Sequence, residues 1–169
     1  MKAFAVVVST LLLVLALLVQ RTLIGRLNFP LGRPDLVVVT LVCIAVVQGP
    51  MWGASFGFAI GLLADLLSDH TLGRLALVFC LVGYAAGLLS REVERSVLVP
   101  LATAAAACGA AVGMFALFGA LLGDGQVAPA DVAGRAVSVA VYALVLTPLL
   151  FPVIAALLRR LDPFRAERR

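Results

Sequence analysis

The chain has 169 residues, of which 63% are hydrophobic and 13% are charged, and its net charge is +4 at pH 7. A soluble domain is typically about half apolar and a quarter charged, so this excess of apolar side chains needs lipid as its solvent. The basic residues flank apolar runs and form no stripe with interleaved aromatic residues, so we expect no nucleic-acid binding. The composition predicts an integral membrane protein that contacts membrane lipid.

Residues that could carry out chemistry are scarce in this sequence. It contains no HExxH, no GxSxG, no phosphate-binding loop and no paired carboxylates. Cys43, Cys80 and Cys108 each lie in a different apolar run without a CxxC pair or a neighbouring histidine, which indicates small buried side chains. His70 is the only histidine and is expected in a loop. We therefore predict a protein that is not an enzyme and holds no metal or cofactor.

The first apolar run covers residues 3–19. It resembles a signal peptide, but no small-residue cleavage site follows it, whereas Arg21 and Arg26 do, so an uncleaved first span is expected. Residues 20–35 contain two glycines and two prolines and form the first predicted loop.

The second apolar run is short. Residues 36–49 would rise about 21 Å as a helix, which is less than the roughly 30 Å hydrocarbon core of a bilayer. This run must therefore tilt, re-enter the membrane or continue beyond Gly49 and Pro50, where the helical pattern breaks. The third run, residues 51–67, begins directly after that break.

Three more apolar runs complete the chain. The predicted spans lie near residues 3–19, 36–49, 51–67, 75–89, 97–122 and 136–158. Residues 123–131 form the last predicted turn, and residues 159–169 form a basic cytoplasmic tail. We expect an all-α polytopic membrane bundle of about six transmembrane helices with a short second helix, built as one domain over residues 1–158.

The distribution of lysine and arginine indicates the orientation, since basic residues beside spans tend to stay cytoplasmic. With six spans the side of the tail carries eight basic residues and the other side five, whereas one broken span over residues 36–67 gives ten against three. Charge alone favours five spans, but 32 residues with Gly-Pro in the middle suit a single crossing poorly, so six are retained. Both alternatives place the C-terminus in the cytoplasm, and six spans place the N-terminus there too.

Small residues recur at helical spacing in several runs. Gly53, Gly57, Gly61 and Asp65 recur every fourth residue and so share one face of the third span. Gly83 with Gly87, Gly109 with Gly113, and Gly119 with Gly123 repeat the spacing. Glycines at this spacing let helix backbones approach each other closely. We expect them to pack the bundle internally, and the alternative is a groove for a partner helix.

Asp65 continues the glycine face at the end of the third run. An acid within the hydrocarbon must face protein or a water-filled cavity. Because Asp69 follows four residues later, near the end of the span, we expect Asp65 to be a solvated helix terminus. Its possible ionic partners are Arg74 and Arg33.

The segment from residue 33 to residue 89 carries a family resemblance. Its motifs are Arg33-Pro34-Asp35-Leu36, Gly49-Pro50, Gly53-x-x-x-Gly57, the run from Gly61 through Asp65 to Leu67, Leu72-Gly73, and Gly83-Tyr84-x-x-Gly87. Together they resemble the family of the rod shape-determining protein MreD. The resemblance implies that Pro34 and Asp35 begin the second span, that the glycines set the packing, and that Asp65 closes the polar end of the third span.

The function implied by this resemblance is that of a non-enzymatic inner-membrane subunit of the bacterial cell-elongation complex, or elongasome. Such a subunit associates with MreC and is linked to MreB, to RodA and to a class B penicillin-binding transpeptidase. It acts as a scaffold in rod shape and lateral peptidoglycan synthesis. The family is also similar in fold to the substrate-binding membrane subunits of energy-coupling-factor transporters, so the alternative is a vitamin-type small-molecule binding subunit of a membrane transporter.

Overall fold

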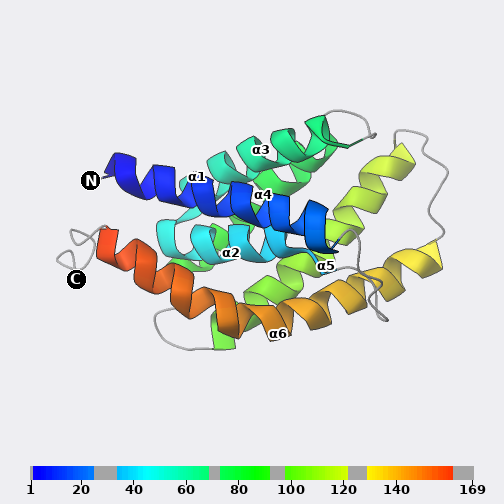
Figure 1. Cartoon of the computed structure of the whole chain (residues 1–169). Coiled ribbons are helices and arrows are strands. Elements are labelled where there is room, and N and C mark those ends of the chain that lie inside the picture. Colours follow the sequence, from blue (N-terminus) through cyan, green and yellow to red (C-terminus); the bar gives the residue numbers. More distant parts are fainter. Residues whose placement is uncertain (1, 25–33, 69–72, 92–97, 122–128, 162–169) are drawn as a thin grey trace.

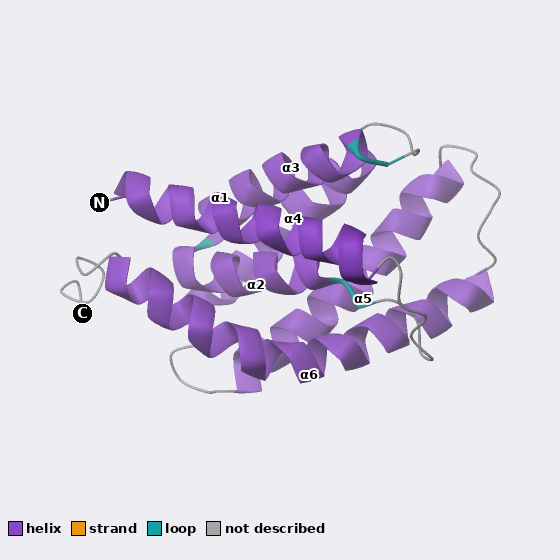
Figure 2. Ribbon diagram, viewed as in Figure 1, coloured by secondary structure: helices purple, strands orange, loops and turns teal. Residues whose placement is uncertain are grey.

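The computed structural model describes residues 2–24, 34–68, 73–91, 98–121 and 129–161 (Figure 1). These residues are almost entirely helical, without a strand among them (Figure 2), so the all-α expectation is confirmed. The elements are α1 (Lys2–Val19), a π-helical turn η1 (Gln20–Ile24), α2 (Leu36–Gln48), α3 (Pro50–Leu66), α4 (Arg74–Leu88), a 3₁₀ turn η2 (Leu89–Arg91), α5 (Leu98–Leu121) and α6 (Pro129–Leu161).

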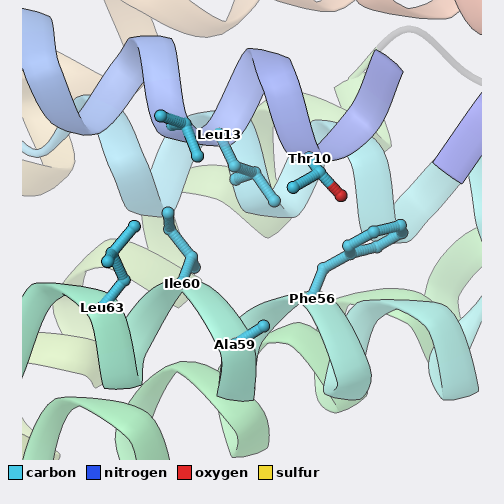
Figure 3. Close-up of a pocket in the computed structure, with 7 residues that line it drawn as sticks. Thr10, Leu13, Phe56, Ala59, Ile60 and Leu63 are labelled. Atoms are coloured by element: carbon cyan, nitrogen blue, oxygen red, sulfur yellow. The ribbon is translucent and has the colours of Figure 1, made fainter. Parts of the chain in front are cut away.

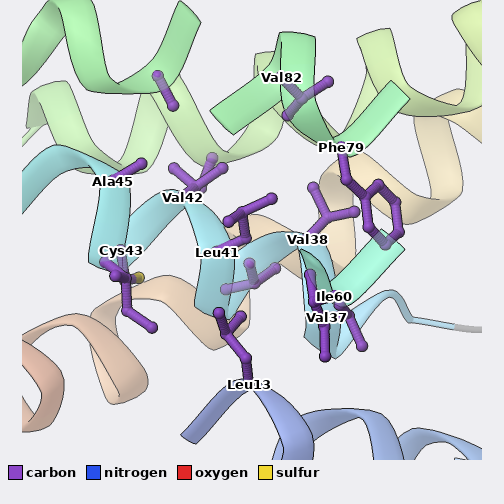
Figure 4. Packing of buried hydrophobic residues seen from close by; sticks show 14 of the residues in the cluster. Leu13, Val37, Val38, Leu41, Val42, Cys43, Ala45, Ile60, Phe79 and Val82 are labelled. Atoms are coloured by element: carbon purple, nitrogen blue, oxygen red, sulfur yellow. The ribbon is translucent and has the colours of Figure 1, made fainter. Parts of the chain in front are cut away.

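The short helix α2 lies at the centre of the bundle. Residues 37–46 are all buried, and α2 contacts all five other α-helices. Figure 4 shows the α2 side chains surrounded by Leu13 of α1, Ile60 of α3, and Phe79 and Val82 of α4. A helix that is apolar on every side can be surrounded by protein or by lipid, and here protein surrounds it. The shortness of α2, about 20 Å, is therefore accommodated by wrapping it in protein.

The chain reverses direction between α2 and α3. Gly49 has a φ of 96°, a conformation that favours glycine, and Pro50 is the first residue of α3, a position that suits proline. The Val37 N–H at the start of α2 donates to Gln20 Oε1 (3.0 Å), and Arg21 donates to the carbonyl of Ala64 near the end of α3 (3.3 Å). The start of α2 and the end of α3 thus both lie beside the end of α1, so residues 36–67 form two antiparallel helices.

Among the described residues, three helices are long and apolar enough to cross a membrane, namely Phe4–Thr22, Leu98–Leu121 and Val132–Leu158. Helices α2, α3 and α4 are shorter apolar helices. The start of α1 (blue) and the end of α6 (red) lie at the same end of the bundle in Figure 1.

The helix bounds differ from the expected spans mainly in α6. Each of the first five helices begins and ends within one residue of the expected span. Helix α6 begins at Pro129, seven residues before the expected residue 136, because proline fits the first turn of a helix and residues 130–135 continue the helix. Residues 129–131, expected in a turn, and 159–161, expected in the tail, are therefore helical, and residues 162–169 lie outside the described part.

Candidate functional site

The face of α3 that carries the glycines packs against α4. A Cβ atom added to Gly53 would overlap the carbonyl oxygen of Gly83, and one added to Gly57 would overlap the carbonyl oxygen of Phe79. No side chain fits between these two backbones. The absence of a side chain at Gly53, Gly57 and Gly83 is what allows the helices to approach so closely.

The same close approach continues to both ends of the α3–α4 pair. A Cβ atom on Gly61 would lie 2.6 Å from the carbonyl oxygen of Leu75, and one on Gly87 would lie 2.5 Å from the Cα atom of Pro50. The structure therefore places all five of these glycines against other parts of the same chain, which leaves them no free surface for a partner helix.

Asp65 lies in the last turn of α3 with only 1% of its surface exposed. Its Oδ2 atom accepts hydrogen bonds from the N–H groups of Gly73 (3.0 Å) and Ala76 (3.1 Å), and Oδ1 accepts one from Leu75 (3.1 Å). The first N–H groups of a helix have no partner within the helix, and a negative charge is favourable there. Asp65 therefore caps the start of α4, and the expectation of a solvated helix terminus is wrong.

Gly73 allows the chain to enter α4 beneath this carboxylate. Its φ of 93° is left-handed, a conformation that side chains other than glycine rarely adopt. The sequence shows Asp65 eight residues before Gly73, but only the tertiary turn brings the carboxylate to the N–H groups.

Arg74 joins α4 to α5 and is 6% exposed. Its Nε donates to the carbonyl of Phe115 at 3.0 Å, its Nη2 donates to the same oxygen, and its guanidinium carbon lies 3.7 Å from the centre of the Phe115 ring. A cation over an aromatic face is attracted most strongly when both are removed from water. A Cβ atom on Gly119 would overlap the Arg74 guanidinium, so this glycine makes room for the arginine. The sequence predicts that Gly119 packs inside the bundle, but it gives no sign of the contact with Arg74 or of the role of Phe115.

Arg21 ties the end of α1 to the end of α3. Its Nη2 donates to the Ala64 carbonyl (3.3 Å) and to Ser68 Oγ, and the Ser68 hydroxyl donates to the same carbonyl (2.7 Å). A cation is favourable at the carboxyl end of a helix. We call Arg21, Asp65, Arg74 and Phe115 the polar end cluster, because together they tie α1, α3, α4 and α5 at one end of the bundle. Their described bonds go mainly to backbone groups, an arrangement that positions helices.

Asp35 is the N-cap of α2 and follows the buried Pro34, so these two residues begin the second helix. Its Oδ1 atom accepts a hydrogen bond from the N–H of Val38 (3.2 Å). Removal from water raises the pKa of the Asp35 carboxyl, against the lowering effects of bonds to the Val38 backbone and Gln20 and of the charge on Arg135. The hydrogen bond of the cap therefore stabilises the start of α2, whereas burial disfavours the negative charge of the Asp35 carboxylate.

Substitutions at Asp35 should separate the cap from its charge. Asp35→Ala should lower the free energy of unfolding by about 1 kcal/mol, because it removes the cap. Asp35→Asn keeps an acceptor without the charge and should be at least as stable as wild type at pH 7. Because the folded-state pKa is raised, wild type should lose stability relative to D35N as the pH rises from about 4. Thermal unfolding in detergent across pH checks this, and equal losses in D35A and D35N would contradict it.

The remaining predicted residues occupy varied positions. Tyr84 is exposed on the outer surface of α4, Cys43 and Cys108 are buried, and Cys80 is partly buried. His70 and Arg33 lie outside the described residues. Within the described ranges there is no group of three histidine, cysteine, aspartate or glutamate residues that could hold a metal ion.

A comparison with protein families gives a match. The family model described as rod shape-determining protein MreD matches residues 1–161. This range covers every described helix and the whole polar end cluster. A comparison with curated proteins finds no match.

Proposed function

Because the chain belongs to the MreD family of rod shape-determining proteins, we propose that it is a non-enzymatic subunit of the bacterial elongation complex that binds the membrane span of MreC. The family match over nearly the whole chain carries this proposal, and it places the protein in rod shape determination. Through MreC the protein would influence lateral peptidoglycan synthesis by RodA and a class B penicillin-binding transpeptidase. The complex would also be linked to MreB filaments.

We place the contact with MreC on α5. Within the described residues, a Cβ atom added to Gly109 or Gly113 would have no neighbour within 4 Å. Ala106, Ala110 and Leu117 on the same side of α5 are exposed. Small residues at this spacing allow close helix contact in a membrane. The glycines of α3 and α4 pack against other parts of the same chain, so they are not open to a partner helix.

The orientation in the inner membrane follows from the bundle and the basic residues. The start of α1 and the end of α6 share one end of the bundle. In the sequence Lys2 begins α1, and five arginines follow residue 158. Basic flanks favour the cytoplasm, so this multi-pass protein would have both termini there.

Co-purification with MreC after mild detergent extraction tests the proposed function. Wild type should retain MreC, and Gly113→Leu should reduce the retained amount about tenfold without lowering the unfolding temperature, because the site is open. Ala85→Leu on the exposed side of α4 is the matched control and should retain MreC fully. Failure of wild type to capture MreC, together with normal cell shape on depletion, would overturn the proposed function. If G113L retained as much MreC as wild type, α5 would be excluded as the contact with MreC.

The transporter alternative requires a polar cavity with several hydrogen-bonding side chains. The groove that the structure describes between α1 and α3 is lined by apolar residues and one threonine, Thr10. This groove therefore does not favour the alternative.

A further inference from the structure

A half-open groove runs along the outside of the bundle between α1 and α3. It offers about 70 Å³ of free space and is lined mainly by Thr10, Leu13 and Val14 of α1 and Phe56, Ala59 and Leu63 of α3. Figure 3 shows side chains of both helices facing each other across it. The Thr10 hydroxyl donates to the Val6 carbonyl (2.9 Å), so the polar atom of this lining is already bonded within α1. The groove is suited to a hydrocarbon.

The cation of Arg21 lies just beyond the groove, because it bonds the carbonyl of Ala64, the residue after Leu63 in the lining. Arg21 is eleven residues after Thr10, and eleven residues at 100° each return to nearly the same side of a helix. Arg21 is exposed, and both of its described bonds use Nη2, toward Ala64 and Ser68. Its Nε and Nη1 donors have no partner among the residues that the structure describes. Arginine presents such donors in a planar fork that matches a phosphate.

The spacing between the groove and the cation matches one leaflet of a bilayer. Eleven helical residues rise about 16 Å, close to half of the roughly 30 Å hydrocarbon core. A chain that lies against Thr10 near mid-membrane would bring its headgroup to Arg21. A helix about 10 Å across is too large for a free space of about 70 Å³, whereas part of an extended acyl chain fits it.

We propose that an anionic glycerophospholipid binds here, with one acyl chain in the α1–α3 groove and its phosphate on the free donors of Arg21. The bound lipid fills the gap between α1 and α3, and its phosphate extends the contact that Arg21 makes with the end of α3. This site is separate from the proposed MreC contact on α5, so either can fail without the other.

Native mass spectrometry of the full chain in detergent tests the headgroup contact. Titration with dioleoylphosphatidylglycerol should give one tightly bound lipid, whereas dioleoylglycerol, which lacks the phosphate, should bind about five- to tenfold more weakly. Arg21→Gln should remove this preference. Arg135→Gln, an exposed arginine on α6 at the same end, is the matched control and should keep it. Equal binding of phosphatidylglycerol by R21Q and wild type would overturn the proposal.

A second variant tests the groove without altering Arg21. Ala59→Phe should fill the groove and abolish tight binding of both lipids, whereas Ala85→Phe on the exposed side of α4 should not. A phosphatidylglycerol with a diazirine in one acyl chain should label residues 10–14 and 56–63 in vesicles. Labelling that persists in A59F, or that the membrane span of MreC displaces from the groove, would overturn the proposal.

Discussion

Gly57→Leu should cost ~3 kcal/mol or more of folding free energy, at the upper end of the usual cost of overpacking. The added side chain would overlap the backbone of Phe79, and a backbone has no alternative rotamer with which to move aside. The closest helix pair of the bundle would have to separate, and Ala45 on the central helix packs against the same interface at Gly53.

A thiol-reactive dye followed during heating measures this effect, because Cys43 and Cys108 are free and buried and react only when the bundle opens. Gly134→Leu is the matched control. Gly134 is exposed on α6 with no atom within 4 Å of an added Cβ among the described residues, and leucine is the better helix former. We expect G134L to melt at or above the wild-type temperature. A G57L protein that melts like G134L would contradict the packing of α3 on α4.

Asp65→Ala should have the second large effect, about 3 kcal/mol or more. It leaves three N–H groups at the start of α4 without their acceptor, and each buried donor left unpaired costs roughly 1–3 kcal/mol. Asp65→Asn keeps one acceptor oxygen and should fall between the alanine variant and wild type. Asp35→Ala is the natural comparison, because the Asp35 side chain likewise caps a helix, accepting from the N–H of Val38 at the start of α2.

Amide hydrogen exchange locates the effect of D65A. Residues 73–76 should exchange much faster in D65A than in wild type, and the first turn of α2 should be unchanged. Slow exchange of residues 73–76 in D65A would show that another group caps α4.

The sequence predicts the helices of this protein well because Gly, Pro and Arg interrupt its apolar runs. Gly49 and Pro50 separate α2 from α3, and the spacing of Gly53 and Gly57 identifies the closest packing face. The central position of α2 could not be predicted, since an all-apolar run looks the same whether lipid or protein surrounds it.

The polar contacts were beyond sequence reasoning because their partners are far apart along the chain. Arg74 bonds a carbonyl 41 residues away, and Arg21 bonds one 43 residues away. The charge count preferred five spans because Arg21, Arg26 and Arg33 change sides between the two counts. A count of residues cannot show that Arg21 bonds the carboxyl end of α3.

The enclosure of α2 by five helices has a consequence for how the bundle assembles during synthesis. Helix α2 leaves the ribosome before α3 to α6 exist, and it is too short to span a bilayer without locally thinning it. Lipid is as apolar as the valines of α2, so no hydrophobic force draws this helix out of the lipid into the bundle. Close packing, together with the hydrogen bond from the Val37 N–H to Gln20, secures its final place, and that packing is complete only when α6 has been made and packs over it.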